Sequence, residues 1–312
     1  MNAVLQAGTP ALERPRFYCD PRWVEAFAGT YDLDLQWCVV HRGTELKAAL
    51  PLLTRRRFGM RFATTPLMMM YNPVWFAPSD DLPNRVLRER LESSGAIARV
   101  LQKHFHRIDI ALGPELTDVR GFSWAGLRLD PHYTYVIDIT RPLALHGSKK
   151  KALQKAKQES YTLHEERDLD AYIEMHKLTM GRHGRGAVVA DILQKRLITR
   201  LLDAGLARQF VVKADGKPVH SRIWLQDDTY KIAYAWQGVS DPAWLPRGVY
   251  TWATVELMKR FAGDGYTHLD MGGANMDSIA QFKAGFGGDL VLHFRARKPL
   301  PGAIGWLRGL LP

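Results

Sequence analysis

The residues best suited to chemistry lie near the end of the chain, where an apolar strand expected over residues 268–271 runs into the paired glycines Gly272 and Gly273. A short helix around 278–284 then presents Phe282 and Lys283 ahead of a second glycine cluster. Glycines let backbone N–H groups approach a ligand closely. A lysine placed there can hold the oxyanion that forms when a nucleophile attacks an acyl carbonyl. The alternative is that Lys283 is an ordinary lysine on the surface of a helix.

Asp270 ends the same strand, directly before the glycines. It can act as a base, or it can orient the backbone of Gly272 and Gly273. The second role is the commoner one, because Asp side chains often hydrogen-bond the backbone of a turn. Asp270 is therefore a candidate catalytic residue with a structural alternative.

The pattern of the second half predicts the elements that hold these residues. A hairpin turn at Asp215-Gly216 joins two strands, and an apolar stripe over 249–262 predicts a helix that Gly263 and Gly265 end. This mixture of strands and helices predicts an α+β fold. The expected strands are residues 208–214, 219–226, 230–236, 268–271 and 290–294.

The first half reads as a similar mixture. A helix is expected over 84–105, with a centre weakened by Ser93-Ser94-Gly95. The expected domain junction is 127–131. The expected strands of this half are residues 37–41, 46–53 and 108–112, and a further strand follows the junction at 133–139.

Several segments, taken in order, resemble the Fem-type peptidyltransferases and their BioF2-like acetyltransferase relatives. They are the strand 133–139, the basic helix 149–157, the segment 179–182, the hairpin, the helix ending at Gly265, the turn at 270–273, and Phe282-Lys283. Those proteins are N-acyltransferases built on the GNAT acetyltransferase fold. The resemblance implies two GNAT-like domains in tandem, 1–130 and 131–312, each with a mixed, mostly antiparallel sheet flanked by helices.

The resemblance also implies roles for single residues. Phe282 and Lys283 would lie at the reactive end of the acyl donor, where Lys283 would hold the oxyanion. Gly272 and Gly273 would shape the donor channel. Arg182 would bind a phosphorylated or carboxylated acceptor, since a guanidinium makes bidentate bonds to such anions.

The strand 230–236 would line the acceptor cleft in such an enzyme. Tyr234 and Trp236 are two residues apart on it and therefore point to one face. Packing in the core is the alternative for both aromatic residues.

The sequence departs from the family at three places. Peptidoglycan-type members usually carry an aromatic residue shortly after Arg182, whereas this chain has Arg185 within a His-Gly-Arg-Gly run. A smaller or more acidic acceptor, held by Arg182 and Arg185, is one interpretation, and a basic exposed loop is the other. The pyrophosphate loop of ordinary GNAT enzymes keeps only Arg247 and Gly248, which weakens acyl-CoA as the donor and favours aminoacyl-tRNA. Residues 169–206 hold only two short helices, which leaves no room for a long helical arm.

The net charge of +11 favours a polyanionic partner, although many basic proteins have none. Arg55-Arg56-Arg57 and the helix around residue 150 form two dense cationic segments. Lysines on phosphates would give salt-sensitive binding of tRNA, and a solvated helix face is the alternative. The expected tRNA contacts are Lys149, Lys150, Lys151 and Lys155, with Lys157 beside them.

These observations predict an aminoacyltransferase that moves an aminoacyl group from aminoacyl-tRNA to an amine. An acyltransferase dependent on acyl-CoA or an acyl carrier, and a GNAT-fold protein that only binds tRNA or anions, are the alternatives. The acceptor would be a small biosynthetic amine or a cell-wall precursor, with no bound cofactor and no metal. With no signal peptide or spanning segment in view and only two cysteines, a cytoplasmic location and no membrane insertion are expected.

Overall fold

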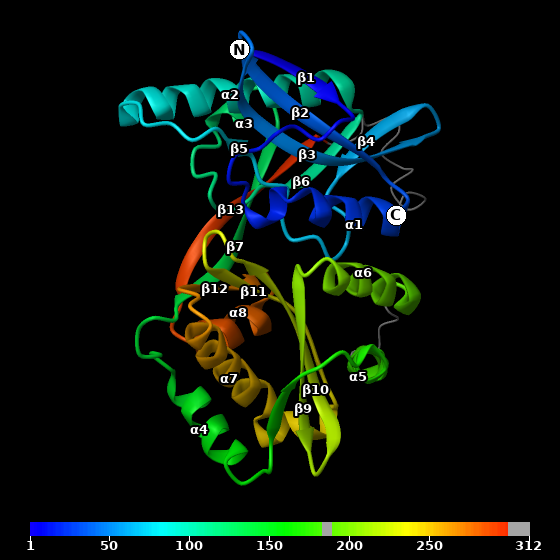
Figure 1. Cartoon of the computed structure of the whole chain (residues 1–312), viewed down its shortest axis with the longest axis vertical. Coiled ribbons are helices and arrows are strands. Elements are labelled where there is room, and N and C mark those ends of the chain that lie inside the picture. Colours follow the sequence, from blue (N-terminus) through cyan, green and yellow to red (C-terminus); the bar gives the residue numbers. More distant parts are fainter. Residues whose placement is uncertain (183–188, 299–312) are drawn as a thin grey trace. The chain divides into compact units, whose positions relative to one another are not determined.

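The chain folds as two units, between which it passes along two strands, β7 (Arg128–Asp138) and β13 (Asp289–Lys298). The computed structural model describes residues 1–182 and 189–298 (Figure 1). Unit 1 contains residues 1–132 and, of the described chain, residues 292–298; unit 2 contains residues 133–291. The segment 127–131, expected as a junction, lies next to this division, but most of it belongs to β7.

Unit 1 is built on a sheet with the strand order β1-β2-β3-β4-β6-β13, and β5 pairs with β3. Its strands run antiparallel except for the β4–β6 pair. The three strands predicted before residue 113 are confirmed as β2, β3 and β6. The elements are β1 (Asn2–Gln6), η1 (Phe17–Cys19), α1 (Pro21–Tyr31), β2 (Asp34–Arg42), β3 (Glu45–Arg57), β4 (Met60–Thr64), β5 (Trp75–Phe76), α2 (Pro83–His104), β6 (Arg107–Ala111) and α3 (Arg120–Trp124).

Helix α2 runs without interruption through Ser93-Ser94-Gly95, where the sequence predicted a weak centre. These three residues are buried, and a Cβ added at Gly121 of α3 would lie 2.6 Å from the backbone nitrogen of Gly95. The small residues therefore let α3 approach the backbone of α2. Tertiary packing outweighs the low helix propensity of glycine and serine here.

Unit 2 is built on a sheet with the order β7-β12-β11-β10-β9-β8. All strands and helices predicted for the second half are present, but the last of them, predicted over 290–294, is β13, whose described residues from 292 onward belong to unit 1 and pair with β6. Within the described residues, no helix has the length and apolar character needed to cross a bilayer. The elements are α4 (Gly147–Ala156), β8 (Thr162–Glu165), α5 (Leu169–Arg182), α6 (Asp191–Asp203), β9 (Ala207–Ala214), β10 (Lys217–Asp227), β11 (Ile232–Ser240), η2 (Pro242–Arg247), α7 (Val249–Gly263), β12 (His268–Gly273) and α8 (Asp277–Ala284).

Helices cover both faces of this sheet (Figure 1). Helix α7 packs on one face, where its apolar stripe meets residues such as Phe210, Trp224 and Leu269 in the main core of the unit. Helix α4 packs against α7, and α5 and α6 contact the sheet through β9, β10 and β11. The helix predicted over 249–262 is therefore present as α7, which contacts the sheet and α4.

The sheet opens between β11 and β12. These two strands are parallel, and their pairing extends only from Ile232–His268 to Tyr234–Asp270. Beyond Tyr234, β11 continues to Ser240 without β12 beside it. Because the two strands separate after Tyr234, side chains of both strands border the space between β11 and β12. The candidate functional residues of unit 2 lie around this space.

Candidate active site

A cavity of about 1050 Å³ lies in unit 2 at this opening. Its walls come from α4, α5, β10, β11, the η2–α7 connection, the end of β12 and α8. Among the lining residues in the described part of the chain, four are cationic and none is acidic. A ligand with negative charge is therefore the one that this cavity suits. The four cations are Lys151, Lys155, Arg222 and Lys283.

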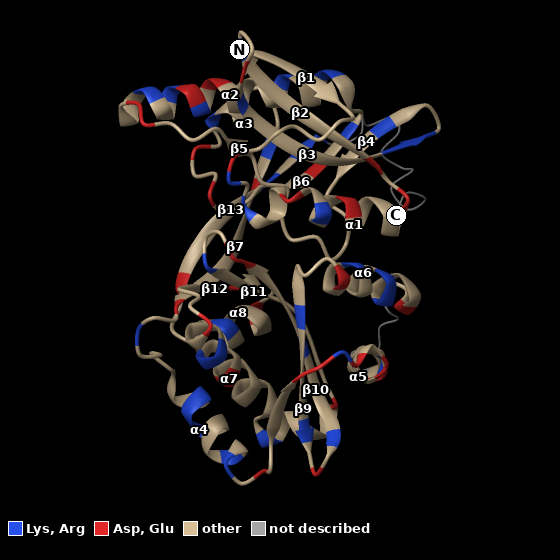
Figure 2. Ribbon diagram, viewed as in Figure 1, with Lys and Arg blue, Asp and Glu red and all other residues tan. Residues whose placement is uncertain are grey.

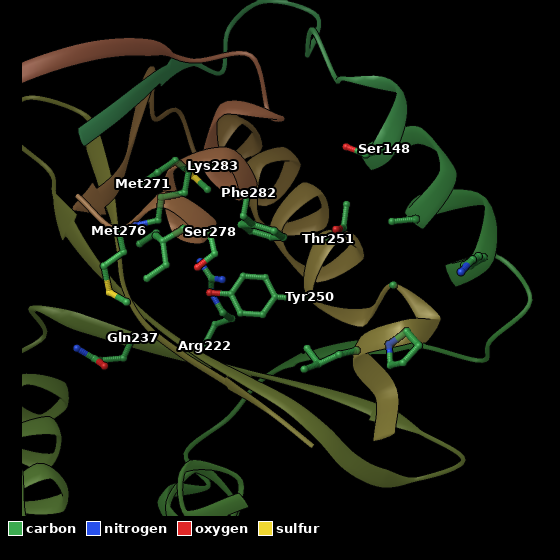
Figure 3. A pocket seen from close by; sticks show the side chains of 18 of the residues that line it. Ser148, Arg222, Gln237, Tyr250, Thr251, Met271, Met276, Ser278, Phe282 and Lys283 are labelled. Atoms are coloured by element: carbon green, nitrogen blue, oxygen red, sulfur yellow. The ribbon is translucent and has the colours of Figure 1, made fainter. Parts of the chain in front are cut away.

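Lys283 lies in the last turn of α8 and reaches into the cavity (Figure 3). Its Nζ donates a hydrogen bond of 2.8 Å to the carbonyl oxygen of Gly273. Burial, together with the positive charge of Arg222, lowers the pKa of Lys283 to about 8, and Asp270 opposes this shift. An ammonium with this pKa is largely protonated near pH 7, so it can donate hydrogen bonds to a developing oxyanion.

Phe282 lies beside Lys283 and also lines the cavity. Its ring makes edge contacts with Tyr250 and Phe286, at centroid distances of 5.1 and 5.3 Å. The Nζ atom of Lys149 lies 3.2 Å from the centroid of the Phe282 ring. Phe282 therefore links α8 to both α7 and α4, which fixes the helix that carries Lys283.

Lys149 does not lie on an exposed basic face, as the sequence had suggested. Its side chain is buried, and this burial lowers its pKa to about 8. Gly285 provides the space, because a Cβ there would lie 2.6 Å from Cε of Lys149. The prediction of Lys149 as a tRNA contact is wrong in this respect, since the ammonium packs on Phe282 and Phe286 rather than facing solvent.

The other three lysines of that prediction are exposed on α4. Lys151 and Lys155 lie one helical turn apart and line the cavity, whereas Lys150 does not. In Figure 2 the Lys positions along α4 are blue segments of the ribbon. The helix therefore contributes positive charge both to the cavity and to the adjacent surface.

The start of α7 faces these lysines across the cavity. Gly248, Tyr250 and Thr251 line it, and Gly248 caps the helix without a side-chain hydrogen bond. Gly248 has a φ of 83°, and a Cβ there would lie 2.3 Å from the carbonyl oxygen of Ala152. Only glycine fits at this position, where α7 packs closely on α4. The predicted role of Gly248 in donor binding stays a prediction.

Arg247 behaves differently from Gly248. It is exposed, its guanidinium stands 4.4 Å from the ring centroid of Trp244, and it forms an ion pair of 3.4 Å with Glu159. It does not line the cavity. The positive charge near the start of α7 comes instead from Lys151 and Lys155.

Of the two aromatic residues predicted to share one face of β11, only Trp236 lines the cavity. Trp236 lines the cavity together with Ala235, Gln237 and Gly238, but Tyr234 is buried elsewhere. The reason is an irregularity in the β10–β11 register, which pairs Ile223 with Gln237 and Trp224 with Ala235 and leaves Trp236 extra. Such a bulge breaks the alternation of side chains on which the prediction of a shared face depended.

Asp270 and the two glycines form the end of β12 rather than a separate turn. Asp270 is buried and accepts hydrogen bonds from the backbone nitrogen of Gly272 and from the hydroxyl of Thr134 on β7. Gly272 has a φ of 74°. None of Asp270, Gly272 and Gly273 lines the cavity, but the carbonyl of Gly273 holds Lys283. This geometry matches the structural alternative for Asp270.

Arg182 ends α5, close in sequence to Met180, which lines the cavity. The side chain of Arg182 and the whole of Arg185 lie outside the described residues. Their predicted role in binding the acceptor stays a prediction.

Arg222 is the residue that sequence reasoning missed. It lies on β10, is 3% exposed and lines the cavity. A basic residue between Ser221 and Ile223, in the middle of an apolar strand, was the available signal, because a charged residue is almost never fully buried without a partner. Tyr250 was missed as well; its ring stands 4.7 Å from the guanidinium of Arg222.

A second cavity, of about 440 Å³, lies within unit 1. Arg55 and Arg57, two of the three consecutive arginines noted in the sequence, line it together with Arg107 and Arg295. Asp109 lines it too and pairs with Arg295, so part of this positive charge is neutralised. Arg55 and Arg57 supply positive charge to unit 1 that is independent of the cavity in unit 2.

Comparison with known proteins identifies the domain that contains this cavity. Residues 146–284 match the family model of the acetyltransferase (GNAT) domain, which spans the elements from α4 to α8. A comparison with curated proteins finds no match.

Solved structures resemble the whole chain in fold. FemX superposes with a TM-score of 0.65 at 14% identity, covering 88% of this chain and 90% of that one. The C-terminal domain of a protein assigned as a lysylphosphatidylglycerol synthetase in Agrobacterium fabrum gives 0.54 at 15% identity, over 92% and 90% of the two chains. L-PGS from Bacillus licheniformis gives 0.55 at 12% identity, over 93% and 94%.

The protein is therefore an acyltransferase with a GNAT acetyltransferase domain in its second half. The predicted α+β fold is confirmed, with a GNAT domain over residues 146–284, as is the resemblance in fold to the Fem-type group. The fold and the domain define the class of reaction, while the donor, the acceptor and the roles of single residues depend on the chemistry of the site itself.

Proposed function

We propose that this protein transfers an aminoacyl group from aminoacyl-tRNA to an amine and thereby forms an amide. The observation that carries the proposal is the position of Lys283, in a cavity whose described lining has four cations and no acid. Resemblance to the Fem-type enzymes, for which the donor is aminoacyl-tRNA, supports the choice of donor. A cytoplasmic location, where charged tRNA occurs, belongs to the same proposal.

In the proposed reaction, the neutral amine of the acceptor attacks the ester carbonyl carbon of the donor. A C–N bond forms, and the carbonyl oxygen becomes an oxyanion. Lys283 donates hydrogen bonds to this oxygen, which stabilises the transition state more than the ground state. The C–O bond to the ribose then breaks, and the proton lost by the amine passes to the leaving ribose oxygen.

The position of Lys283 suits this role because, among the described residues, one of its three N–H bonds is engaged, with the carbonyl of Gly273. The remaining two N–H bonds are available to a substrate oxygen. Helix α8 is held by the contacts of Phe282 with Tyr250 and Lys149. Such a fixed donor stabilises an oxyanion with little reorganisation, which is the main source of rate in this type of catalysis.

The cationic side chains of α4 support a nucleic-acid donor. Lys151 and Lys155 line the cavity opposite the start of α7. The exposed Lys150 on α4 and Lys157 directly after its end continue this positive charge. We assign Lys151 and Lys155 to the terminal phosphates of the tRNA acceptor end. Contacts of this type bind phosphates without regard to sequence and weaken as salt concentration rises.

An acyl-CoA donor is the second candidate, because of one observation. The first turn of α7 faces the cavity at Gly248 and Thr251, and a helix N-terminus binds the phosphates of a nucleotide through its free N–H groups. Lys151 and Lys155 would then hold a pyrophosphate. The chemistry at Lys283 is the same for an ester and for a thioester, so the donor has to be decided by experiment.

The test is a donor screen. The purified full chain is incubated with a charged tRNA pool or with mixed acyl-CoAs, each with a panel of amines, and amide products are identified by mass spectrometry. Product that depends on charged tRNA and disappears after RNase treatment supports the proposal. Product with acyl-CoA alone supports the second candidate and overturns the first.

A matched pair of double variants sharpens the screen. Lys151→Ala with Lys155→Ala removes two cations that line the cavity, whereas Lys217→Ala with Lys259→Ala removes two exposed cations that do not. We expect the first pair to raise the KM for the donor by about tenfold or more, since each lost phosphate contact weakens binding. Equal effects of the two pairs would show that only the overall charge matters.

A further inference from the structure

Arg222 is a buried cation that has no polar partner among residues 1–182 and 189–298. It is 3% exposed, and its Nε and Nη1 atoms are buried with no hydrogen-bond partner. No acidic or carbonyl group in the described part of the chain bonds to it; its guanidinium lies against the rings of Trp224 and Tyr250, at 5.2 and 4.7 Å. Burying a charge without a partner costs desolvation free energy, which a bound group of opposite charge can offset.

The backbone of the neighbouring strand makes room for this guanidinium. Arg222 on β10 pairs in register with Gly238 on β11. A Cβ at Gly238 would lie 2.8 Å from Cδ of Arg222 and 3.0 Å from the hydroxyl oxygen of Tyr250. Any larger residue at this position would displace Arg222, so Gly238 determines where the guanidinium stands.

The cavity places other polar groups beside it. In Figure 3 the side chains of Arg222, Tyr250 and Ser278 converge from β10, α7 and α8. Ser278 belongs to the first turn of α8, whose cap makes no side-chain hydrogen bond. In the same view, the rings of Phe282 and Tyr250 lie between Arg222 and Ser278 on one side and Thr251 and Ser148 on the other. Thr251 and Ser148 belong to the part of the cavity near Lys151 and the start of α7.

We infer that Arg222 recognises a carboxylate carried by the acceptor amine. A planar carboxylate accepts two parallel hydrogen bonds from a guanidinium, and these charge-assisted bonds are strong in a buried site. Lys151 and Lys155 are already assigned to the donor phosphates, so Arg222, on the far side of Phe282 and Tyr250, is left for the acceptor. This inference rests on the proposed function and adds the class of acceptor: an amino acid or a peptide that retains a free carboxylate.

The first experiment compares acceptors that differ only in the carboxylate. L-lysine is paired with 1,5-diaminopentane, and glycylglycine with glycylglycinamide. We expect the wild-type protein to prefer the carboxylate member, and Arg222→Met to lose about 10- to 100-fold in kcat/KM for that member only. Arg222→Lys should keep part of the preference. Arg196→Met, which removes an exposed arginine of α6, is the matched control and should keep all of it.

Direct binding separates this inference from the proposed reaction. Calorimetry with the same four compounds, without any donor, should show carboxylate binding to the wild-type protein and its loss in Arg222→Met. If no donor supports transfer but this difference persists, the proposed function fails and the carboxylate site stands. If the wild-type protein binds neither carboxylate, or binds them equally well after Arg222→Met, the inference is wrong.

Two further measurements distinguish acceptor binding from a donor contact and from a loss of folding. A rise in the KM of the donor, without a change for the acceptor, would assign Arg222 to a donor phosphate and overturn the inference. Thermal unfolding shows whether Arg222→Met is folded, and we expect it to be at least as stable as the wild type because it removes an unpaired buried charge. Gly238→Ala displaces Arg222 without removing its charge and should reproduce the loss of carboxylate preference.

Discussion

Replacing Lys283 by alanine tests the centre of the proposed reaction. In the wild-type protein, Nζ keeps one hydrogen bond to the carbonyl of Gly273 and has two N–H bonds left for the substrate. Removing one donor from an oxyanion site typically costs about 100- to 1000-fold in kcat. We therefore expect Lys283→Ala to lower kcat by about 100-fold or more while the KM values change little.

The pKa of Lys283 adds a dependence on pH to this loss. With burial holding that pKa at about 8, roughly nine tenths of the side chain is protonated at pH 7 and roughly one tenth at pH 9. The ratio of the wild-type rate to the Lys283→Ala rate should therefore be largest at and below pH 7 and fall about tenfold from pH 7 to pH 9. Taking the ratio cancels the titration of the acceptor amine, which is common to both proteins.

The assay is steady-state amide formation with the donor found in the screen, measured from pH 6 to pH 9.5. Lys283→Arg keeps its charge across this range and should lose the alkaline decline, even if its rate is lower. Lys259→Ala, on the exposed face of α7, is the matched control. A Lys283→Ala rate within about threefold of wild type, or a rate ratio that is constant with pH, would refute the oxyanion role.

The remaining predictions concern the packing around the cavity, and each is checked by chemical denaturation. Gly248→Ala should lower the free energy of unfolding by about 2 kcal/mol or more, because its Cβ would meet the carbonyl of Ala152 at 2.3 Å; Gly147→Ala, with open space around it, should not. Asp270→Ala should cost about 2–3 kcal/mol, since it leaves the buried Gly272 nitrogen and the Thr134 hydroxyl without their acceptor. An unchanged midpoint in either variant would contradict the geometry. Lys149→Met should raise stability at pH 7 by about 1–2 kcal/mol, as about 3 kcal/mol of burial cost exceeds about 1–2 kcal/mol of cation–π attraction. Because burial lowers the pKa of Lys149 to about 8, the unfolded state binds more protons than the folded state between about pH 8 and 10.5. The free energy of unfolding of the wild-type protein should therefore rise over this range relative to that of the Met variant. Parallel plots of the two free energies against pH would refute this prediction.

The order of elements in unit 2 could be predicted because its signals are local. Asp215-Gly216 marks the β9–β10 hairpin, and the apolar stripe and terminal glycines mark α7. Phe282 and Lys283 were found through a short motif on a short helix. Each of these features depends on residues close together in sequence.

Several side chains of the site could not be placed in this way. Tyr234 and Trp236 were expected on one face, but a bulge between β10 and β11 separates them. Lys149 was expected in solvent with its neighbours, but the rings of Phe282 and Phe286 cover it. Both outcomes depend on partners far away in the sequence.

The sequence by itself determined the helices and strands, the motif at Lys283 and the class of fold, because periodicity, turn residues and motif spacing act over a few residues. Only the tertiary structure decided that β11 and β12 part after Tyr234, that Lys151 and Lys155 line the opening, and that Arg222 stands in it without an acidic partner among the described residues. Register, burial and the pairing of charges are set by contacts between distant segments. The environment of a charged residue in a strand is therefore fixed only when the neighbouring strands and helices have packed around it.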